Sequence, residues 1–410
     1  MTSIPLVVPR CTPRLICSTS PHRVAVARGP RLPASGKYIP RPFTCSHDYT
    51  PQTTWRASSN VPRPQQAAAT QTMSSSAFKQ RPSPAVPRPS SSVILVSPRN
   101  EILLLHRVKT SNSFASAHVF PGGNLSAQDG QCPPAEDLKR HDDGPWYRNA
   151  AIRELFEESG ILLAKDKVSG KMLAVPEEQR ESGRRAIHQN QTTFLEWLKQ
   201  QSPNAVPDTD GLIPFTRWIT PTTNSRRYTT QMYLYFLPLP AEAEKPVLDE
   251  IPSEGQREEI QVPTSDGGVE VTEARFLPAS EWLQMAQRGD IILFPPQFLL
   301  LHLVAGFLDM EPRVAASLQE LHRRRAKLTE FVSTGQPPWS EKCISPKMLR
   351  MSSDGRTVLA LDQPGPELRG TDKQGETERV VLVKFKRGEA RELEVRWKQD
   401  AFEAEAKSNL

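Results

Sequence analysis

The spacing of apolar and polar residues predicts an α/β fold from Val93 onward. Two apolar runs, "SSVILVSP" and "EILLLHRV", share the turn "SPRN", a pattern typical of paired strands. Further buried strands are expected at "TRWIT", "TTQMYLYFLPL" and "VEVTEARFLP". Helices are expected at "WYRNAAIRELFEES", "ASEWLQMAQRGD" and "PPQFLLLHLVAGFL". The C-terminal region contains two expected hairpins, "KMLRMSSDGRTVLALD" and "RVVLVKFKRGEARELEVRW".

The first of these helices has recognisable start and stop signals. Asp142 and Asp143 are expected to cap it, Pro145 to lie in its first turn and Gly160 to end it. One face is expected to be buried, because it carries small and apolar residues: Ala151, Ile152, Leu155 and Phe156.

The first 92 residues differ in composition from the rest of the chain. Up to Ser92 the formal net charge is +11, against +6 for all 410 residues, which leaves −5 for the remainder. Fifteen of the 39 prolines also fall there, among Ser, Thr, Gln and Ala, so this segment has too few apolar residues to bury a core. We therefore expect a disordered basic leader over 1–92, a main domain over 93–310, and a helix and β-hairpin extension over 311–410.

The leader also has the composition of a targeting segment. Arginines recur among Ser, Thr and small apolar residues with no acid before Asp48, which favours a mitochondrial transit peptide, whereas early prolines favour a plain basic tail. Two other destinations stay open. The C-terminal "SNL" resembles a peroxisomal signal, and translation from Met73 would leave a cytosolic chain without most of the arginines. No apolar run has the length of a membrane span, and five scattered cysteines indicate neither a disulfide framework nor a zinc site.

Three glutamates share one face of the helix expected over 146–159. Glu154, Glu157 and Glu158 stand at i, i+3 and i+4, so their carboxylates project together and repel one another by a few tenths of a kcal/mol per pair. A solvated acidic face is the ordinary explanation. The alternative is a divalent cation, and oxygen donors without nearby His or Cys select Mg²⁺ or Mn²⁺.

The surroundings of the glutamates resemble the signature of the Nudix hydrolases. That signature reads Gly, five residues, Glu, seven residues, then Arg-Glu-apolar-any-Glu-Glu-any-Gly-apolar. The second half is similar at every fixed position: Arg153, Glu154, Leu155, Glu157, Glu158, Gly160 and Ile161. Asp129 stands where the first Glu belongs, and 23 residues separate it from Arg153. Such an interrupted box, preceded by "AHVFPGG" and followed by "RWITPTTNSRRYTTQMYLYFL" and "FPPQF", resembles the Nudix-motif-nineteen branch, whose members hydrolyse coenzyme A and its thioesters.

The resemblance implies a fold: a Nudix α/β/α sandwich with a mixed sheet, insertions at 130–150 and about 165–211, and a C-terminal β-rich extension. The second insertion would be either a lid over the substrate or a plain surface insertion.

The resemblance also implies roles for particular residues. Glu154, Glu157 and Glu158 would bind Mg²⁺ or Mn²⁺, while Glu154, Glu157 and Arg153 would form the catalytic group, with Glu154 as the base. Asp129 would hold Arg153, and Gly122 and Gly123 would let the loop turn toward the helix. A later carboxylate, Glu270 or Glu273, would complete the metal site; a solvated surface acid is the other interpretation of either residue.

Residues outside the box bear on the substrate. Arg107 keeps the spacing of a motif found in CoA-cleaving relatives, although Asn112 and Ser116 replace an Arg and a Gly of that motif. Arg107, Arg226 and Arg227 are each either phosphate ligands or solvated surface charges. A lone histidine on a strand, His118, is expected to be structural.

The leading interpretation is a metal-dependent diphosphatase acting on a small nucleoside diphosphate derivative, coenzyme A or acyl-CoA. Its products would be 3′,5′-ADP and (acyl-)4′-phosphopantetheine. Two alternatives stay open. One is a Nudix hydrolase of NADH or capped RNA. The other is a non-catalytic binding module with the leader as an electrostatic arm, although three convergent carboxylates favour an enzyme with no stable nucleic-acid partner.

Overall fold

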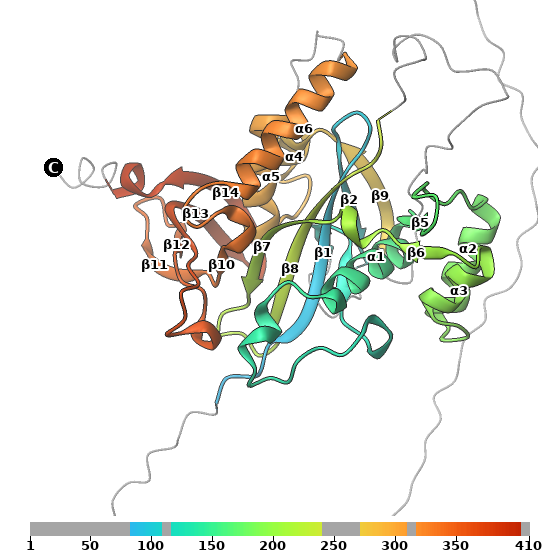
Figure 1. Ribbon diagram of the computed structural model, residues 1–410. Coiled ribbons are helices and arrows are strands. Elements are labelled where there is room, and N and C mark those ends of the chain that lie inside the picture. Colours follow the sequence, from blue (N-terminus) through green and yellow to red (C-terminus); the bar gives the residue numbers. More distant parts are fainter. Residues whose placement is uncertain (1–82, 109–115, 240–270, 310–316, 403–410) are drawn as a thin grey trace, which may run out of the picture. The chain divides into compact units, whose positions relative to one another are not determined.

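The computed structural model describes residues 83–108, 116–239, 271–309 and 317–402 (Figure 1). Several features singled out in the sequence lie outside these ranges, namely the leader up to Pro82 with Met73, Asn112, Glu270 and the C-terminal "SNL".

Eight strands of the described chain form one mixed sheet. Six follow the order β10-β7-β8-β1-β2-β3, while β4 pairs with β1 and β9 with β2. β1 runs parallel to β8 and antiparallel to β2, which confirms the expected strand pair and the mixed sheet. The strands are β1 Arg88–Val96, β2 Ile102–Arg107, β3 His118–Val119, β4 Gly122–Asn124, β7 Ile213–Ile219, β8 Tyr228–Phe236, β9 Val271–Leu277 and β10 Cys343–Ile344.

The folded region begins earlier than the sequence indicated. β1 starts at Arg88, whereas the main domain was expected to start at Val93. Ser90 and Ser91 are buried because β1 pairs with β8 on one side and β4 on the other, and the Ser90 and Thr230 hydroxyls lie 2.6 Å apart. A run of serines therefore belongs to the sheet, because its backbone groups are paired on both sides.

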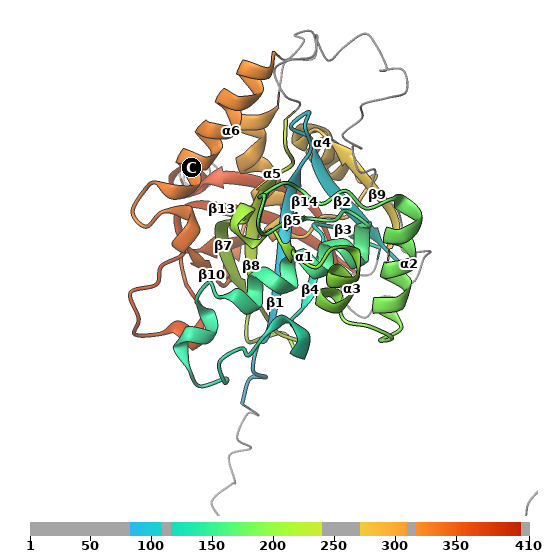
Figure 2. The same cartoon turned by 45° about the vertical axis from the view of Figure 1, so that its right-hand side comes forward.

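Helices cover both faces of the sheet, as expected for an α/β/α arrangement. α1 (Pro145–Ser159) lies against β1 and β4 (Figure 2), and its apolar residues share a core with Val93 and Leu95. The alternate residues Ile94 and Val96 face a second core, built with α4 (Ala279–Arg288) and α5 (Pro295–Leu308). α6 (Leu318–Ser333) packs on this second side.

The expected insertion around 165–211 is structured and packs beside α1. It contains α2 (Glu177–His188), α3 (Phe194–Gln201) and a two-stranded sheet of β5 (Ala164–Asp166) and β6 (Ala205–Pro207). Phe156 of α1 stacks on Trp197 of α3 with ring centroids 4.7 Å apart.

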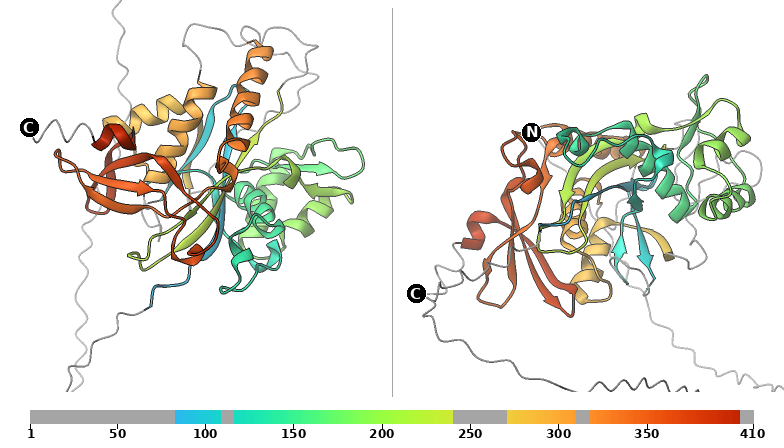
Figure 3. Two further views of the ribbon diagram at one scale, coloured as in Figure 1. Left: turned by 60° about the vertical axis from the view of Figure 1, so that its left-hand side comes forward. Right: turned by 90° about the horizontal axis from the view of Figure 1, so that it is seen from below.

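The two expected C-terminal hairpins are confirmed, and together they form a second, four-stranded antiparallel sheet (Figure 3). Val381, Val383 and Leu393 of this sheet belong to the same core as α5. The strands are β11 Lys347–Met351, β12 Thr357–Leu361, β13 Glu376–Lys386 and β14 Glu389–Trp397. Short 3-10 helices complete the described chain: η1 Ala127–Asp129, η2 Leu138–His141, η3 Thr209–Gly211, η4 Trp339–Glu341 and η5 Pro366–Leu368. None of the described helices combines the length and apolar character that crossing a membrane requires.

Candidate active site

α1 carries the glutamate cluster, and its ends differ in one respect from the sequence prediction. Gly160 ends the helix in the left-handed conformation, as expected. At the other end Gly144 is the N-cap, and neither Asp142 nor Asp143 caps the helix. Asp143 instead pairs with Arg148 at 2.6 Å and accepts a hydrogen bond from the Tyr233 hydroxyl at 2.6 Å.

The expected insertion over 130–150 overlaps the expected helix and is partly buried. Its last residues, 145–150, form the first turns of α1, and Tyr147 is fully buried. His141 of η2 is buried too, with its Nδ1 3.0 Å from the Thr229 hydroxyl. The aromatic rings of Tyr147 and His141 give this polar segment surface that it can bury in the fold.

The glycine loop, which we define as residues 121–123 at the start of β4, brings its backbone against the glutamates. Gly122 has a φ of 149°, and a Cβ there would collide with the Ser91 carbonyl oxygen of β1. A Cβ on Gly123 would lie 2.5 Å from the carboxyl carbon of Glu154. The absence of side chains at both positions therefore lets the loop fit between the sheet and the glutamate face of α1.

Arg153 lies at the centre of the cluster. Its Nε and Nη2 donate to the two oxygens of Asp129 at 2.7 and 2.8 Å, and its Nη1 donates to Glu157 at 3.1 Å. Nη2 also lies 2.9 Å from a Glu154 oxygen. Burial disfavours the charge of Arg153, but the Asp129 hydrogen bonds and the neighbouring carboxylates raise its pKa overall. The expected contact between Asp129 and Arg153 is thus present.

Glu158 has different partners from the other two glutamates. The Gly122 N–H donates to its Oε2 at 2.8 Å, and Arg107 Nη1 lies 3.3 Å from its Oε1. The side chain of Glu158 is 6% exposed, whereas those of Glu154 and Glu157 are 16% and 18% exposed. Glu154 and Glu157 therefore meet at Arg153, whereas Glu158 is held by Gly122 and Arg107, and solvent reaches all three carboxylates only partly.

The charges of the cluster favour a cation. Burial raises the pKa of Glu154 to about 7, Arg153 opposes this, and the nearby Glu157 carboxylate adds to it. Oxygen donors of this kind are those that Mg²⁺ and Mn²⁺ prefer. The residues present thus fit a hard divalent ion, which would relieve their mutual repulsion.

The candidate phosphate ligands have different surroundings. Arg107 lies beside Glu158 in the cluster, and Arg226 is exposed in the turn between β7 and β8. Arg227 is buried and pairs with Glu367 at 2.5 Å, and it also donates to the Thr220 and Ala85 carbonyl oxygens. Arg227 is therefore neither a solvated turn residue nor an exposed phosphate ligand, because Glu367 and two carbonyl oxygens surround its guanidinium.

Glu273 lies away from the α1 carboxylates. Along β9, Ala274 and Phe276 pack on the core that contains α1, whereas Leu277 packs on the core of α4 and α5. Side chains alternate along a strand, so Glu273 faces the α4 side. The structure therefore does not bring Glu273 to the expected metal site.

One residue at the site had no signal in the sequence. Arg184 of α2 is buried and donates through Nε and Nη2 to the Glu157 carbonyl oxygen at 3.2 and 3.0 Å. In the sequence it is one arginine within a polar helix. Its contact ties the second insertion to the helix that bears the glutamates.

The chain is similar in sequence to known proteins. The family model for the NUDT19 Nudix domain matches residues 136–303. The acyl-coenzyme A diphosphatase NUDT19 of Xenopus laevis is 24% identical over 267 residues, covering 54% of this chain and 62% of that protein. The protein of the same name from Gallus gallus is 28% identical over 271 residues, covering 54% and 64%. A NUDIX hydrolase structure from Alicyclobacillus acidocaldarius is 22% identical, with a TM-score of 0.41, and covers 54% of this chain and 91% of that one.

Residues 136–303 of this chain are therefore similar to the Nudix domain of NUDT19. The matches span less than two thirds of the length of the NUDT19 relatives.

Proposed function

We propose that this protein is a metal-dependent Nudix diphosphatase that cleaves the diphosphate of coenzyme A or acyl-CoA, releasing 3′,5′-ADP and (acyl-)4′-phosphopantetheine. The observation that carries the proposal is the contact of Glu154 and Glu157 with Arg153, together with the Gly122 N–H bound to Glu158 of the same helix. The relatives named acyl-coenzyme A diphosphatase support this substrate class.

Glu154, Glu157 and Glu158 would hold Mg²⁺ or Mn²⁺, which when bound neutralises charge on the diphosphate and acidifies a water molecule. Arg153 keeps the glutamates in place, since it contacts Glu154 and Glu157 while Asp129 fixes its own guanidinium. Glu154 is the residue we propose as the base, because it lies against both Arg153 and the Gly123 backbone.

Two features would favour the binding of a diphosphate substrate. The Gly122–Gly123 backbone lies against the glutamates without side chains that would block access to them. Arg107, with 16% of its side chain exposed, lies 3.3 Å from Glu158 and is the arginine that we propose to contact a substrate phosphate.

The test is a substrate panel at fixed Mg²⁺ with products resolved by mass. The panel contains CoA, acyl-CoA thioesters of several lengths, NADH and a capped RNA, each assayed with the full chain and with Glu157→Gln as the matched control. We expect 3′,5′-ADP and a phosphopantetheine fragment from the CoA compounds with the unaltered chain only. Preferred cleavage of NADH or the cap would replace the proposed substrate. A folded protein that cleaves no compound in the panel would point to a binding module.

A further inference from the structure

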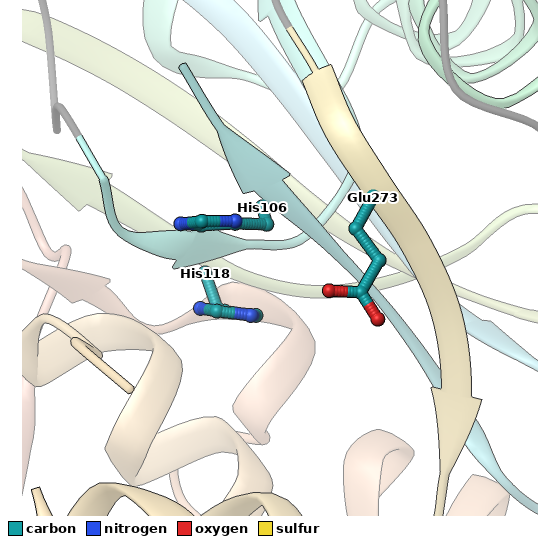
Figure 4. Close-up of side chains that lie close together, drawn as sticks. All are labelled: His106, His118 and Glu273. Carbon is teal, nitrogen blue, oxygen red and sulfur yellow. The ribbon is translucent and has the colours of Figure 1, made fainter. Parts of the chain in front are cut away.

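A second group of potential metal ligands lies on three neighbouring strands. His106 of β2 pairs directly with His118 of β3 on one side and with Glu273 of β9 on the other. Figure 4 shows the two imidazoles one above the other with the Glu273 carboxylate beside them. The imidazole centroids are 4.6 Å apart with an angle of 11° between the rings, and one donor atom from each of the three residues lies within 4.8 Å of the others.

This group is separate from the glutamates of α1. Leu103 and Leu105 of β2 belong to the core that contains α1, whereas Ile102 and Leu104 belong to the core of α4 and α5. By alternation His106 lies on the α4 side. The His118 ring lies 5.6 Å from the Trp282 ring of α4, which places it on the same side. The sheet therefore lies between this group and the candidate active site.

His118 has an unsatisfied polar atom. The residue is only 8% exposed, and its Nδ1 has no hydrogen-bond partner among the described residues. Burying a polar atom without a partner is unfavourable, so this imidazole is set apart from an ordinary core histidine. An ion bound to Nδ1 would give that atom a partner.

The other two residues can reach an ion. His106 Nδ1 lies 3.0 Å from the Thr272 hydroxyl, a contact that orients its ring. Glu273 pairs with Arg275 at 3.3 Å, but both side chains are nearly half exposed, and such pairs contribute little. An ion at about 2.0–2.1 Å from each donor brings the donors to about 3.4 Å from one another. The two imidazoles are stacked nearly parallel, so one ring must turn for both nitrogens to face one ion; the half-buried His106 can make this turn and the exposed Glu273 can approach by side-chain rotation.

We propose that His106, His118 and Glu273 form a second metal site, for a borderline transition-metal ion such as Zn²⁺. Two imidazoles and one carboxylate are a donor set that Zn²⁺ uses, with a fourth position left for water. Mg²⁺ and Ca²⁺ prefer oxygen donors, so the chemistry differs from that of the α1 glutamates.

An ion at this site would join β3, β2 and β9. β3 is only two residues long and is the last strand in the order β10-β7-β8-β1-β2-β3. It pairs with β2 through two residue pairs. The next residues lead to Gly122, whose N–H binds Glu158, while the residue after His106 is Arg107, which also contacts Glu158. The site would therefore stabilise the two segments that hold Glu158.

The experiment measures binding of Zn²⁺, and of Co²⁺ as a spectroscopic substitute, to the full chain in excess Mg²⁺. We expect one ion per chain with the visible absorption of a Co²⁺ site of nitrogen and oxygen ligands, and a rise in melting temperature on addition of Zn²⁺. His106→Gln and Glu273→Gln, which alter the more exposed ligands, should each weaken binding at least tenfold. His188→Gln, at the exposed end of α2, is the matched control and should bind as the unaltered chain does.

Two results would overturn the proposal: equal affinity in His106→Gln and the unaltered chain, or a loss of affinity caused by Glu157→Gln instead. Because the readouts are binding and melting temperature, the outcome is independent of whether the protein hydrolyses CoA.

Discussion

Arg153 and Asp129 form a buried, two-pronged ion pair between residues 24 positions apart in the chain. The guanidinium donates through Nε and Nη2 at 2.7 and 2.8 Å, and Asp129 also accepts the Ser126 N–H at 2.7 Å. The carboxylate is therefore fixed by its own 3-10 helix, so an Asp can reach Arg153 in a position where the family signature has a Glu.

The first prediction concerns a substitution that removes the charge of the Asp129 carboxylate. Asp129→Asn leaves Arg153 buried without its bidentate partner, and breaking such a pair typically costs about 3–5 kcal/mol of unfolding free energy. Denaturation with urea measures this loss. Asp129→Glu keeps the charge and should retain more turnover than Asp129→Asn, with the difference in kcat and not in KM. Equal stability of Asp129→Asn and the unaltered chain would show that Arg153 does not depend on this pair.

The second prediction concerns the proposed ligands. Glu157→Gln or Glu158→Gln should lower kcat on the preferred substrate by about a hundredfold or more, because the electrostatic contribution of a bound metal is several kcal/mol. Circular dichroism should show an unchanged fold, since removing one like charge from α1 relieves repulsion. Glu177→Gln, on the exposed first turn of α2, is the control. Full activity in a folded Glu157→Gln or Glu158→Gln protein would contradict the assignment.

The third prediction compares the two glycines of the loop. In Gly123→Ala the new methyl group meets the flexible Glu154 carboxylate, so we expect turnover to fall while unfolding free energy changes little. In Gly122→Ala it meets the fixed Ser91 carbonyl at a φ of 149°, so stability itself should fall by about 1–3 kcal/mol. Activity assays and denaturation of both variants separate the effects, and similar stability losses in the two would refute this account.

The fourth prediction concerns pH and His141. Burial lowers the pKa of His141 to about 4, and nearby Arg217 adds to the shift. The unfolded chain takes up this proton near pH 6.5, so unfolding binds a proton between these values and stability falls as pH drops from 7 toward 4. At pH 5 the cost is about 2 kcal/mol. Urea denaturation at pH 7 and pH 5 should show a smaller pH effect in His141→Gln, and an identical pH effect would contradict the assignment.

The fifth prediction concerns location. We propose that the arginine-rich, acid-poor start of the chain directs mitochondrial import, so a fluorescent reporter carrying residues 1–60 should enter mitochondria. A reporter ending in "AKSNL" should enter peroxisomes weakly or not at all, because Asn409 replaces the basic residue of that signal. A cytosolic first reporter would remove the mitochondrial proposal, and strong peroxisomal import of the second would reverse the ranking.

The sequence predicted α1 and its buried face well, because helical periodicity and Gly160 are local signals. The placement of Glu154, Glu157 and Glu158 on one side followed from the same periodicity. The sequence also predicted the strand β9, but it did not predict on which face of the sheet Glu273 lies. That face depends on the register between β9 and β2, which is set by tertiary pairing and has no local signal.

The polarity of a residue in the sequence did not predict whether it is buried. Arg227 and the serines of β1 had the character of surface or linker residues, yet both are buried. Arg227 Nη1 pairs with Glu367 and the Ser90 hydroxyl with Thr230, and both partners lie far away in the sequence. Polarity alone therefore did not distinguish a solvated segment from one whose partners come from elsewhere in the fold.

The pairing of β10 with β7 also affects the order in which the protein folds during synthesis. Cys343 and Ile344 lie parallel to Arg217 and Trp218, so the main sheet cannot acquire this strand until residue 344 has left the ribosome. Val381, Val383 and Leu393, which share the core with α5, emerge later still. The part of the α5 surface that packs against β13 and β14 is consequently covered only after those strands have been synthesised, and until then the nascent chain exposes a surface of the kind that chaperones bind.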